Sequence, residues 1–426
     1  MKENQKIALL NFNKFTSEND DDVIKANYEL IYKRYLIKNK TNQNNQVNRV
    51  FYFLIHSFLL LRSIVTLVSI NLSFKKFNIA HYLIDIDNNS KNYDKRSEHI
   101  LEIVKPRTTI NFFHCSNIFY SLKNSFKVSN PIYFESVLYF FSLRIPKAIE
   151  DDDATFITFI KNKSKREINI LGFLLTLMKV SKFLFIDDAR HTGILRLLCE
   201  AKGIETTAYQ HATIEEFHVG LKGKTFDNYL VWNKFFKIYL KEINPDYEKK
   251  QILICGHPRI KSNSIKISPK LNNIIFLEES NFDFHASLPY MKIIPDEYNL
   301  IFRKKPGLIS NTPSIEGLNV TFSSGSTLEE DLLKFKPLLL IGHESTVLLE
   351  ALLFSIPSLS VGNPKSSNSV IIKKSLVKNC KDLQSFENYL SHYLKMTDSQ
   401  IEDLKIKFWE KSSKTDYKSS LVNLVY

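Results

Sequence analysis

The chain has 426 residues, of which 44% are hydrophobic and 24% are charged, with only 11 glycines and 13 prolines. This composition excludes extensive disorder, and the length suits two domains with separate cores. The formal net charge of +13 attracts nucleic acid, anionic lipid headgroups or phosphorylated small molecules without choosing among them.

The cysteines carry no sign of a disulfide framework or a metal cluster. No CxxC pair occurs, no histidine stands at zinc-ligand spacing, and the cysteines are far apart, at positions 115, 199, 255 and 380. The first residues, MKENQKIALLNFNKF, also lack the charged and apolar regions of a secretory signal. We therefore expect a cytoplasmic protein without a dedicated metal cluster.

The apolar segment at residues 51–74 has the length of a membrane span. Arg62 lies near its middle, with His56 close by, and a central arginine costs about 2.5 to 3.5 kcal/mol in a bilayer. We therefore expect a buried helix of the N-terminal domain, with a helix lying on a membrane surface as the alternative.

Strand, loop and helix signals alternate clearly over residues 182–212. An apolar strand ends at Asp187, a helix is expected at 193–202, and Gly203 supplies a left-handed cap before a strand that ends at Tyr209. Ligands of open α/β sheets bind at the carboxyl ends of parallel strands. That edge is expected to hold Asp187, Asp188, Arg190, Gln210 and His211.

The same alternation continues to the end of the chain and indicates an α/β fold with parallel sheets. His257 and Arg259 end a strand signal at 251–259, and a polar stretch at 260–272 predicts a linker. The expected domains are therefore residues 1–260 and 261–426. The other expected elements are strands at 227–233, 273–280, 298–307, 318–326 and 337–341 and helices at 234–243 and 327–335.

The segment LLLIGHESTVLLEALLFSIPSLSVG, residues 338–362, interrupts an apolar run with a short polar stretch. Ser345 is the expected N-cap of a helix at 346–353. The N–H groups of the first turn and the positive helix end make an anion site. Glu350 lies one turn further on the same face, where a carboxylate accepts hydrogen bonds from a ribose diol. Together they predict a site for a nucleotide mono- or diphosphate.

The run from Gly342 to Leu352, followed by Ile356 and Pro357, resembles the donor-binding signature of bacterial GT-B glycosyltransferases that build capsules and O-antigens. The resemblance implies two Rossmann-like domains that face each other across a cleft, the first binding the acceptor and the second the nucleotide sugar. It also implies a basic turn near the donor phosphates, where this chain has lysine in place of the family's histidine. Lysines, arginines and helix dipoles usually replace a metal ion in such enzymes, so the resemblance implies that no metal and no cofactor are needed. The implied donor-binding residues are His343, Glu344, Ser345, Thr346, Glu350, Arg303, Lys304 and Lys305.

An inverting sugar transfer needs a base for the acceptor hydroxyl and positive charge at the leaving phosphate. We expect the base in the N-terminal domain, with Asp188 as the first candidate, Asp187 and His211 next, and Glu215 or Glu216 behind them. If the configuration is retained, these residues would orient the acceptor instead. The acceptor side of the cleft is expected to include Arg190, Gln210, His257 and Arg259.

Three alternatives remain open. The chain also resembles bacterial sialyl-, polysialyl- and Kdo transferases, which use CMP-activated donors, through Asp187-Asp188, Ser323-Ser324 and His257-Pro258, although the last pair precedes the expected linker. A nucleotide-sugar 2-epimerase of the same shape would share the Glu350 site and need no acceptor. A nucleic-acid binder is motivated by charge alone, and no recognition signature supports it, so no nucleic-acid partner is expected.

The expected partners are a nucleotide-sugar donor and a lipid-linked or oligosaccharide acceptor, used to extend a capsule, an O-antigen or a lipooligosaccharide. Such an enzyme works at the inner face of a membrane rich in anionic lipid, where a basic flank would hold it. Two other motifs predict no function. GLKGKT at 220–225 has His218 where a P-loop needs its first glycine, and HESTV lacks the second histidine of a zincin.

Overall fold

The computed structural model describes residues 3–37, 49–73, 77–85, 97–104, 109–115, 119, 121–122, 129–141, 153–187, 192–258, 267, 270–279, 282–305, 318–323, 327–362, 369–409 and 417–425. Apart from Met1, the chain divides into two units. The N-terminal unit consists of Lys2–His211, Phe217–Cys255 and Asp416–Tyr426, and the C-terminal unit of Ala212–Glu216 and Gly256–Thr415. The division therefore differs from the expected domains, because the main boundary falls at Gly256. In addition, residues 212–216 belong to the C-terminal unit, and residues 416–426 belong to the N-terminal unit. Most of the expected linker at 260–272 lies outside the described residues.

The N-terminal unit is built on a seven-stranded parallel sheet with the order β3-β2-β1-β4-β5-β6-β7. Phe183 and Phe185 are fully buried, as expected for a parallel strand that is covered on both faces. The strands are β1 (Ile79–Asp85), β2 (Thr109–Cys115), β3 (Pro131–Tyr133), β4 (Lys182–Ile186), β5 (Glu205–Tyr209), β6 (Asn228–Val231) and β7 (Gln251–Ile254).

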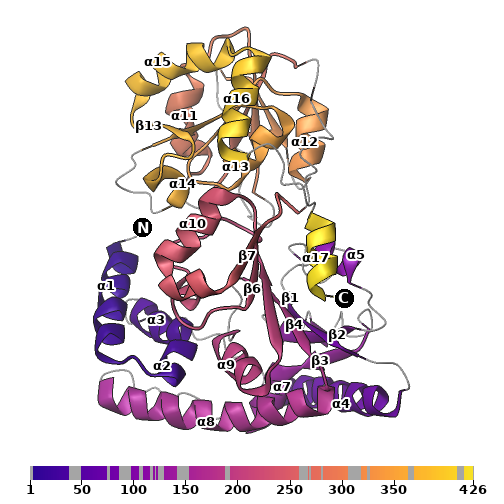
Figure 1. The fold of residues 1–426 in the computed structure, drawn as a ribbon. Helices are drawn as coiled ribbons and strands as arrows, with labels where there is room; N and C mark the ends of the chain where they lie inside the picture. Colours follow the sequence, from indigo (N-terminus) through magenta and orange to yellow (C-terminus); the bar gives the residue numbers. More distant parts are fainter. Residues whose placement is uncertain are drawn as a thin grey trace. The chain divides into compact units, whose positions relative to one another are not determined.

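The helices of this unit come from both ends of the chain (Figure 1). The last helix, α17 (Tyr417–Val425), packs against α5 (Glu98–Ile103), and Lys182 Nζ donates to the carbonyl of Leu424 at 2.6 Å. The remaining helices are α1 (Glu3–Glu18), α2 (Asp22–Ala26), α3 (Tyr28–Ile37), α4 (Arg49–Leu72), α7 (Phe134–Phe141), α8 (Asp153–Met178), α9 (Thr192–Lys202), α10 (Lys234–Ile243) and the 3-10 turns η3 (Val219–Lys222) and η4 (Pro245–Lys249).

Helix α4 is buried on one side only, which corrects the expectation of a buried helix. Its inner side carries Ile55 and Leu59, which pack on Leu83, Phe113 and Tyr133 of the sheet. Its outer side is exposed and apolar. The segment Val50–Leu72 is long and apolar enough to cross a membrane, and one third of its most apolar part is buried inside the structure. Because both sides are apolar, the sequence pattern alone did not distinguish them.

The C-terminal unit has a six-stranded parallel sheet with the order β10-β9-β8-β11-β12-β13. Its strands are β8 (Asn273–Leu277), β9 (Asn299–Arg303), β10 (Val320–Ser323), β11 (Leu339–Gly342), β12 (Ser358–Val361) and β13 (Lys378–Cys380). Its helices are α11 (Phe284–Met291), α12 (Leu328–Phe335), α13 (Val347–Glu350), the 3-10 turn η5 (Ala351–Phe354), α14 (Val370–Lys373), α15 (Leu383–Leu394) and α16 (Asp398–Trp409).

Both sheets share one topological feature that predicts where ligands bind. Counted from the first strand of each sheet, the order is 3-2-1-4-5-6, with a seventh strand added in the N-terminal unit. Successive strands are added toward one edge of the sheet up to the third strand and toward the other edge from the fourth strand on. The order therefore changes between the adjacent first and fourth strands, and ligands of such folds bind outside the carboxyl ends of the strands at that point. The predicted positions are therefore the ends of β1 and β4 in one unit and of β8 and β11 in the other.

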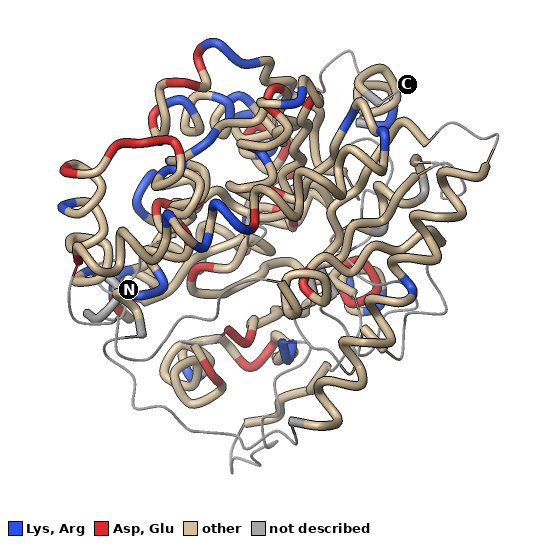
Figure 2. Tube along the Cα trace, turned by 90° about the horizontal axis from the view of Figure 1, so that it is seen from below, with Lys and Arg blue, Asp and Glu red and all other residues tan. Residues whose placement is uncertain are grey.

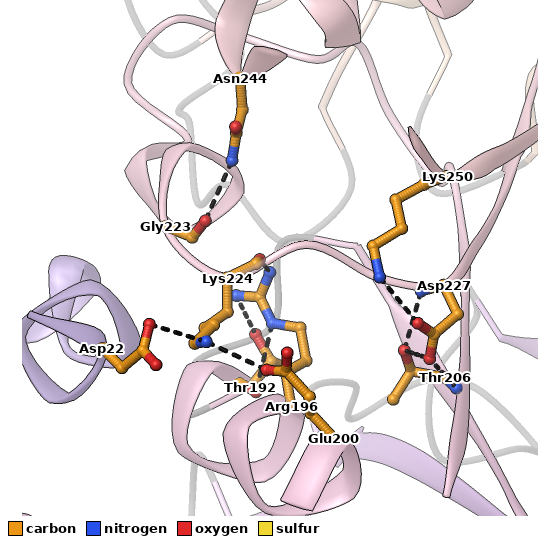
Figure 3. Close-up of polar contacts among 10 residues, drawn as sticks. All are labelled: Asp22, Thr192, Arg196, Glu200, Thr206, Gly223, Lys224, Asp227, Asn244 and Lys250. Atoms are coloured by element: carbon orange, nitrogen blue, oxygen red, sulfur yellow. Dashed lines mark hydrogen bonds and ion pairs between the residues drawn. The ribbon is translucent and has the colours of Figure 1, made fainter. Parts of the chain in front are cut away.

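The GLKGKT segment has the opposite polarity to a phosphate cradle (Figure 3). Arg196, on α9, donates to the carbonyls of Lys224 and Gly220, and Asn244 donates to the carbonyl of Gly223 at 3.0 Å. Lys224 itself forms ion pairs with Asp22 and Glu200. A phosphate site needs backbone N–H groups pointing inward. Here carbonyl groups accept hydrogen bonds from one buried cation, Arg196, and from the Asn244 amide, so the segment is a structural loop.

Candidate functional site

The N-terminal unit places a carboxylate and an imidazole together at the carboxyl end of β4. Asp187 follows β4 directly, and its side chain is 4% exposed. Its carboxylate accepts a hydrogen bond from Tyr229 Oη at 2.8 Å and lies 2.5 Å from His211 Nδ1. A carboxylate at Nδ1 keeps the proton on that nitrogen, so Nε2 is the basic nitrogen of the ring. His211 is also the last residue of this unit before the chain enters the C-terminal unit.

The neighbouring Gln210 has a structural role in place of the expected acceptor contact. Its side chain is fully buried, and its Oε1 accepts the N–H of Trp232 at 2.9 Å. The Trp232 indole N–H donates to the Gln210 carbonyl at 3.1 Å. Gln210 therefore fixes the start of the loop that carries His211. Three other expected residues, Asp188, Arg190 and Arg259, lie outside the described residues.

In the C-terminal unit, an internal carboxylate occupies part of the expected anion site. Glu279, after β8, accepts the backbone N–H groups of His343 at 2.7 Å and Glu344 at 2.8 Å. A Cβ at Gly342 would lie 2.8 Å from Glu279 Oε1, so glycine lets the carboxylate approach the loop. Burial raises the pKa of Glu279. These two N–H groups therefore bind the protein's own carboxyl group, not a phosphate.

The side chain of His343 is also buried and hydrogen-bonded within the protein. It is buried, its ring packs near Phe282 at 6.0 Å, and its Nδ1 donates to the carbonyl of Val361 at 2.7 Å. Gly362, with φ of +106°, leaves room for the ring, because a Cβ there would lie 2.9 Å from Nδ1. His343 therefore ties β11 to the end of β12, and its Nδ1 is occupied within the protein.

The expected helix at 346–353 is shorter and begins differently. Ser345 Oγ accepts the N–H of Val347 at 3.3 Å, and the α-helical turn α13 passes into η5, which is followed by the left-handed cap residue Ser355 with φ of 60°. Among the described residues, the backbone N–H groups of Ser345 and Thr346 have no hydrogen-bond partner. They are the donors that remain for an external anion.

Glu350 has a histidine neighbour that sequence reasoning missed. Its carboxylate lies 3.6 Å from His257 Nε2, and its side chain is 20% exposed. The His257 ring meets Trp409 edge-on at 6.0 Å, and the Trp409 indole donates to the carbonyl of Leu349 at 2.9 Å. His257 was expected on the acceptor side, but it belongs to the C-terminal unit, whose main segment begins at Gly256. The pair supports Glu350 as a partly accessible acceptor of hydrogen bonds.

Arg303 was expected at the donor phosphates, but the structure gives it a buried partner. Its Nε donates to Asp331 at 2.7 Å, and Asp331 also accepts the hydroxyl of Ser323. Both charged side chains are less than 10% exposed, at 9% and 3%. Arg303 therefore joins β9 to α12. The next residue, Lys304, is half-buried, and Lys305 is exposed and donates its backbone N–H to Glu278 at 2.9 Å.

Glu215 is a buried carboxyl group in the segment that the C-terminal unit takes from the N-terminal half. It accepts the Val370 N–H at 2.7 Å, the Thr213 hydroxyl at 2.8 Å and the Ser369 hydroxyl at 3.1 Å. Burial raises its pKa to about 7. The adjacent Glu216 pairs with Lys373 at 2.8 Å. These contacts attach residues 212–216 to α14.

The pKa of Glu215 predicts a pH dependence of stability. The unfolded chain releases this proton near pH 4.5, whereas the folded unit holds it to about pH 7. The folded state binds more protons between these values, so the free energy of unfolding falls as pH rises through this window, by at most about 3 kcal/mol. Urea denaturation from pH 4.5 to 8 measures the slope. It should flatten in Glu215→Gln and persist in the control Glu216→Gln, and equal slopes in all three proteins would contradict the assignment.

Comparisons with known proteins were made by family, by sequence and by structure. No family model matches the chain, and no curated protein matches its sequence. Solved structures do match: MurG from Acinetobacter baumannii has a TM-score of 0.51 at 11% identity and covers 82% of this chain and 99% of its own. The glycosyltransferase SnogD from Streptomyces nogalater has a TM-score of 0.50 at 10% identity, with 82% and 100% covered.

A third similar structure is an epimerase. UDP-GlcNAc 2-epimerase from Neisseria meningitidis, bound to UDP-GlcNAc, has a TM-score of 0.51 at 10% identity and covers 82% of this chain and 98% of its own. At such identities the likeness concerns the fold. Two parallel sheets of seven and six strands, each with helices, agree with these structures. The chain therefore has the two-domain α/β fold of the GT-B class.

Proposed function

We propose that the protein is a glycosyltransferase that moves a sugar from a nucleotide-activated donor to a growing cell-surface glycan, such as a capsule, an O-antigen or a lipooligosaccharide. The acceptor in this proposal is a lipid-linked or free oligosaccharide, and the enzyme works in the cytoplasm at the inner face of the membrane. The observation that carries the proposal is the Asp187–His211 pair at the carboxyl end of β4. The GT-B fold supports it, because SnogD is a glycosyltransferase of similar structure.

In this mechanism His211 is the general base. Its Nε2 takes the proton of the acceptor hydroxyl as that oxygen forms a bond to the anomeric carbon, while the bond from this carbon to the leaving phosphate oxygen breaks. Asp187 stabilises the imidazolium that forms, and Tyr229 holds the carboxylate in place. A dedicated base of this kind fits an inverting transfer.

The C-terminal unit holds the donor in this proposal. The N–H groups of Ser345 and Thr346 and the side chains of Lys304 and Lys305 neutralise the phosphate oxygens in place of a metal ion. Glu350 accepts hydrogen bonds from the ribose diol while it remains paired with His257. Carboxylates accept several hydrogen bonds at once, so the two contacts are compatible.

Nucleotide binding tests the donor site without an acceptor. Thermal-shift measurements with UDP, GDP, CDP, CMP and dTDP should identify one base that stabilises the protein. Glu350→Gln should weaken that nucleotide by about 10- to 100-fold, because a hydrogen bond to a charged group contributes about 1.5 to 3 kcal/mol. Glu387→Gln, an exposed change on α15, is the matched control. An unchanged affinity in Glu350→Gln would contradict the assigned role.

The nucleotide screen also separates the CMP-donor alternative. His257 and Pro258 lie in the C-terminal unit, as a CMP-sugar transferase of the sialyl or Kdo type would require, and His257 contacts Glu350. Ser323, by contrast, is committed to Asp331. Stabilisation by CMP above the other four nucleotides would favour this alternative.

The epimerase alternative rests on the similar structure that binds UDP-GlcNAc. An epimerase converts its nucleotide sugar without an acceptor. Incubation of the protein with UDP-GlcNAc alone, followed by chromatography, should return the unchanged sugar nucleotide if the protein is a transferase. Accumulation of an isomer would replace transfer with epimerisation as the proposed reaction.

A further inference from the structure

The outer side of α4 forms a continuous apolar surface on the N-terminal unit. Exposed apolar residues at positions 54, 61, 65, 68 and 72 follow one another at spacings of seven, four, three and four, which places them along one side of the helix. Leu54, Leu61 and Leu72 are exposed by 57%, 59% and 77%. We call this surface the outer face of α4, and it consists of Val50, Phe51, Phe53, Leu54, Leu61, Ile64, Val65, Val68 and Leu72.

Aromatic side chains from neighbouring segments extend the outer face. Phe51 stacks on Phe119 with ring centroids 5.7 Å apart, and Phe53 meets Phe140 of α7 edge-on at 5.5 Å. Phe141 is 56% exposed, and Phe173 of α8 is 65% exposed. Helices α4 and α8 lie in contact, and Asn71 Nδ2 donates to the Leu177 carbonyl at 3.1 Å. An exposed apolar surface of this extent marks an interaction site.

The charged residues of α4 itself are basic. Helix α4 contains Arg49 and Arg62 and no acidic residue. Figure 2 shows α4 as an almost uncharged tube beside α8, which carries several basic positions. Lys165 and Arg166 are exposed on α8, and Arg166 lies seven residues before Phe173, on the same side of that helix. The apolar surface is thus bordered by positive charge, in a chain with a net charge of +13.

We infer that the outer face of α4 docks on an anionic lipid bilayer. Apolar side chains would enter the headgroup region while the exposed Lys165 and Arg166 pair with lipid phosphates. A second copy of the chain fits less well, because a symmetric contact would bring identical basic, acid-free helices together. The inference rests on the proposed location at the inner membrane face, but its test needs neither donor nor acceptor.

The inner side of α4 shows why the helix lies on the membrane and does not cross it. His56 Nδ1 hydrogen-bonds Ser136 Oγ at 3.0 Å, and Ser63 Oγ accepts the N–H of Tyr133 at 2.9 Å. Ile55 and Leu59 pack on the sheet in the same region. A spanning helix would lose these polar contacts and expose the sheet, whereas a docked helix keeps them.

Vesicle co-sedimentation of the full-length protein tests the inference. The protein should bind vesicles of phosphatidylcholine mixed with phosphatidylglycerol more strongly than vesicles of phosphatidylcholine alone. The double variant Leu61→Asn/Val65→Asn should bind the mixed vesicles at least about tenfold more weakly, because each apolar side chain contributes about 1.5 to 3 kcal/mol when buried. The matched control is Ile238→Asn/Leu333→Asn, at similarly exposed positions on α10 and α12.

Further measurements separate the alternatives. Lys165→Gln/Arg166→Gln should reduce binding to the anionic vesicles and leave the weak binding to neutral vesicles unchanged. Equal loss of binding in the α4 variant and the control variant would overturn the inference. Sedimentation velocity without lipid would overturn it in favour of a second copy if the wild type is a dimer and the α4 variant a monomer. Resistance of bound protein to alkaline carbonate would overturn it in favour of a spanning helix.

Discussion

His211→Gln is expected to lower kcat by about 10²- to 10⁴-fold with little change in donor affinity, because glutamine cannot accept the proton of the acceptor hydroxyl. Asp187→Asn should also lower kcat strongly, since an amide beside Nδ1 favours the wrong tautomer and no longer stabilises the imidazolium. Initial rates with saturating donor and acceptor measure both effects. The thermal shift induced by the nucleotide should stay as in the wild type.

Two controls distinguish this catalytic role from a structural one. Tyr229→Phe removes one hydrogen bond to Asp187 but leaves the imidazole, so its loss of activity should be much smaller. Added imidazole should partly restore His211→Ala, because a free base can enter the space left by the side chain. If His211→Gln turns over at the wild-type rate, the base lies elsewhere, and Asp188 becomes the next candidate.

Arg303→Met is expected to destabilise the C-terminal unit by about 3 to 5 kcal/mol, because it leaves the Asp331 carboxylate buried without its cation. The double variant Arg303→Met/Asp331→Leu should recover most of this loss, since it removes both buried charges. Urea denaturation combined with hydrogen exchange of peptides from this unit measures the change and assigns it to the correct part of the chain.

The same pair of variants tests the reassignment of Arg303 from phosphate ligand to structural residue. If Arg303 only joins β9 to α12, the double variant should bind the donor nucleotide with wild-type affinity. A stable double variant that no longer binds nucleotide would restore the original interpretation. Lys305→Gln is a useful comparison, because Lys305 is exposed and its loss should weaken phosphate binding without affecting stability.

The local elements could be predicted from the sequence because each has a local cause. Gly203 adopts φ of +65° after α9, Asn233 caps α10, and Thr327 forms a capping box with Glu330 at the start of α12. Strand runs such as KFLFI are apolar throughout, as buried parallel strands require. The division of residues 347–354 into α13 and η5 has no comparable signal in the sequence.

The sheet edges that hold the candidate residues could also be predicted, but the hydrogen-bonding partners of these residues could not. Asp187 and His211 were placed at the same sheet edge because both follow strands. The carboxylates that bind the His343 loop and Arg303 come from Glu279 and Asp331, which are 64 and 28 residues away in sequence. Only tertiary structure brings such groups together, and a pattern of short period carries no information about them.

Helix α17 is the last helix in sequence but belongs to the N-terminal unit, and this affects when that unit folds during synthesis. Because Asp416–Tyr426 belongs to that unit, its structure cannot be completed until these residues have left the ribosome. The second unit, by contrast, has all its residues available by Thr415. A truncated protein ending at Cys255 would lack α17, the helix that contacts α5. Expression of the N-terminal unit alone should therefore include residues 416–426, for example by circular permutation.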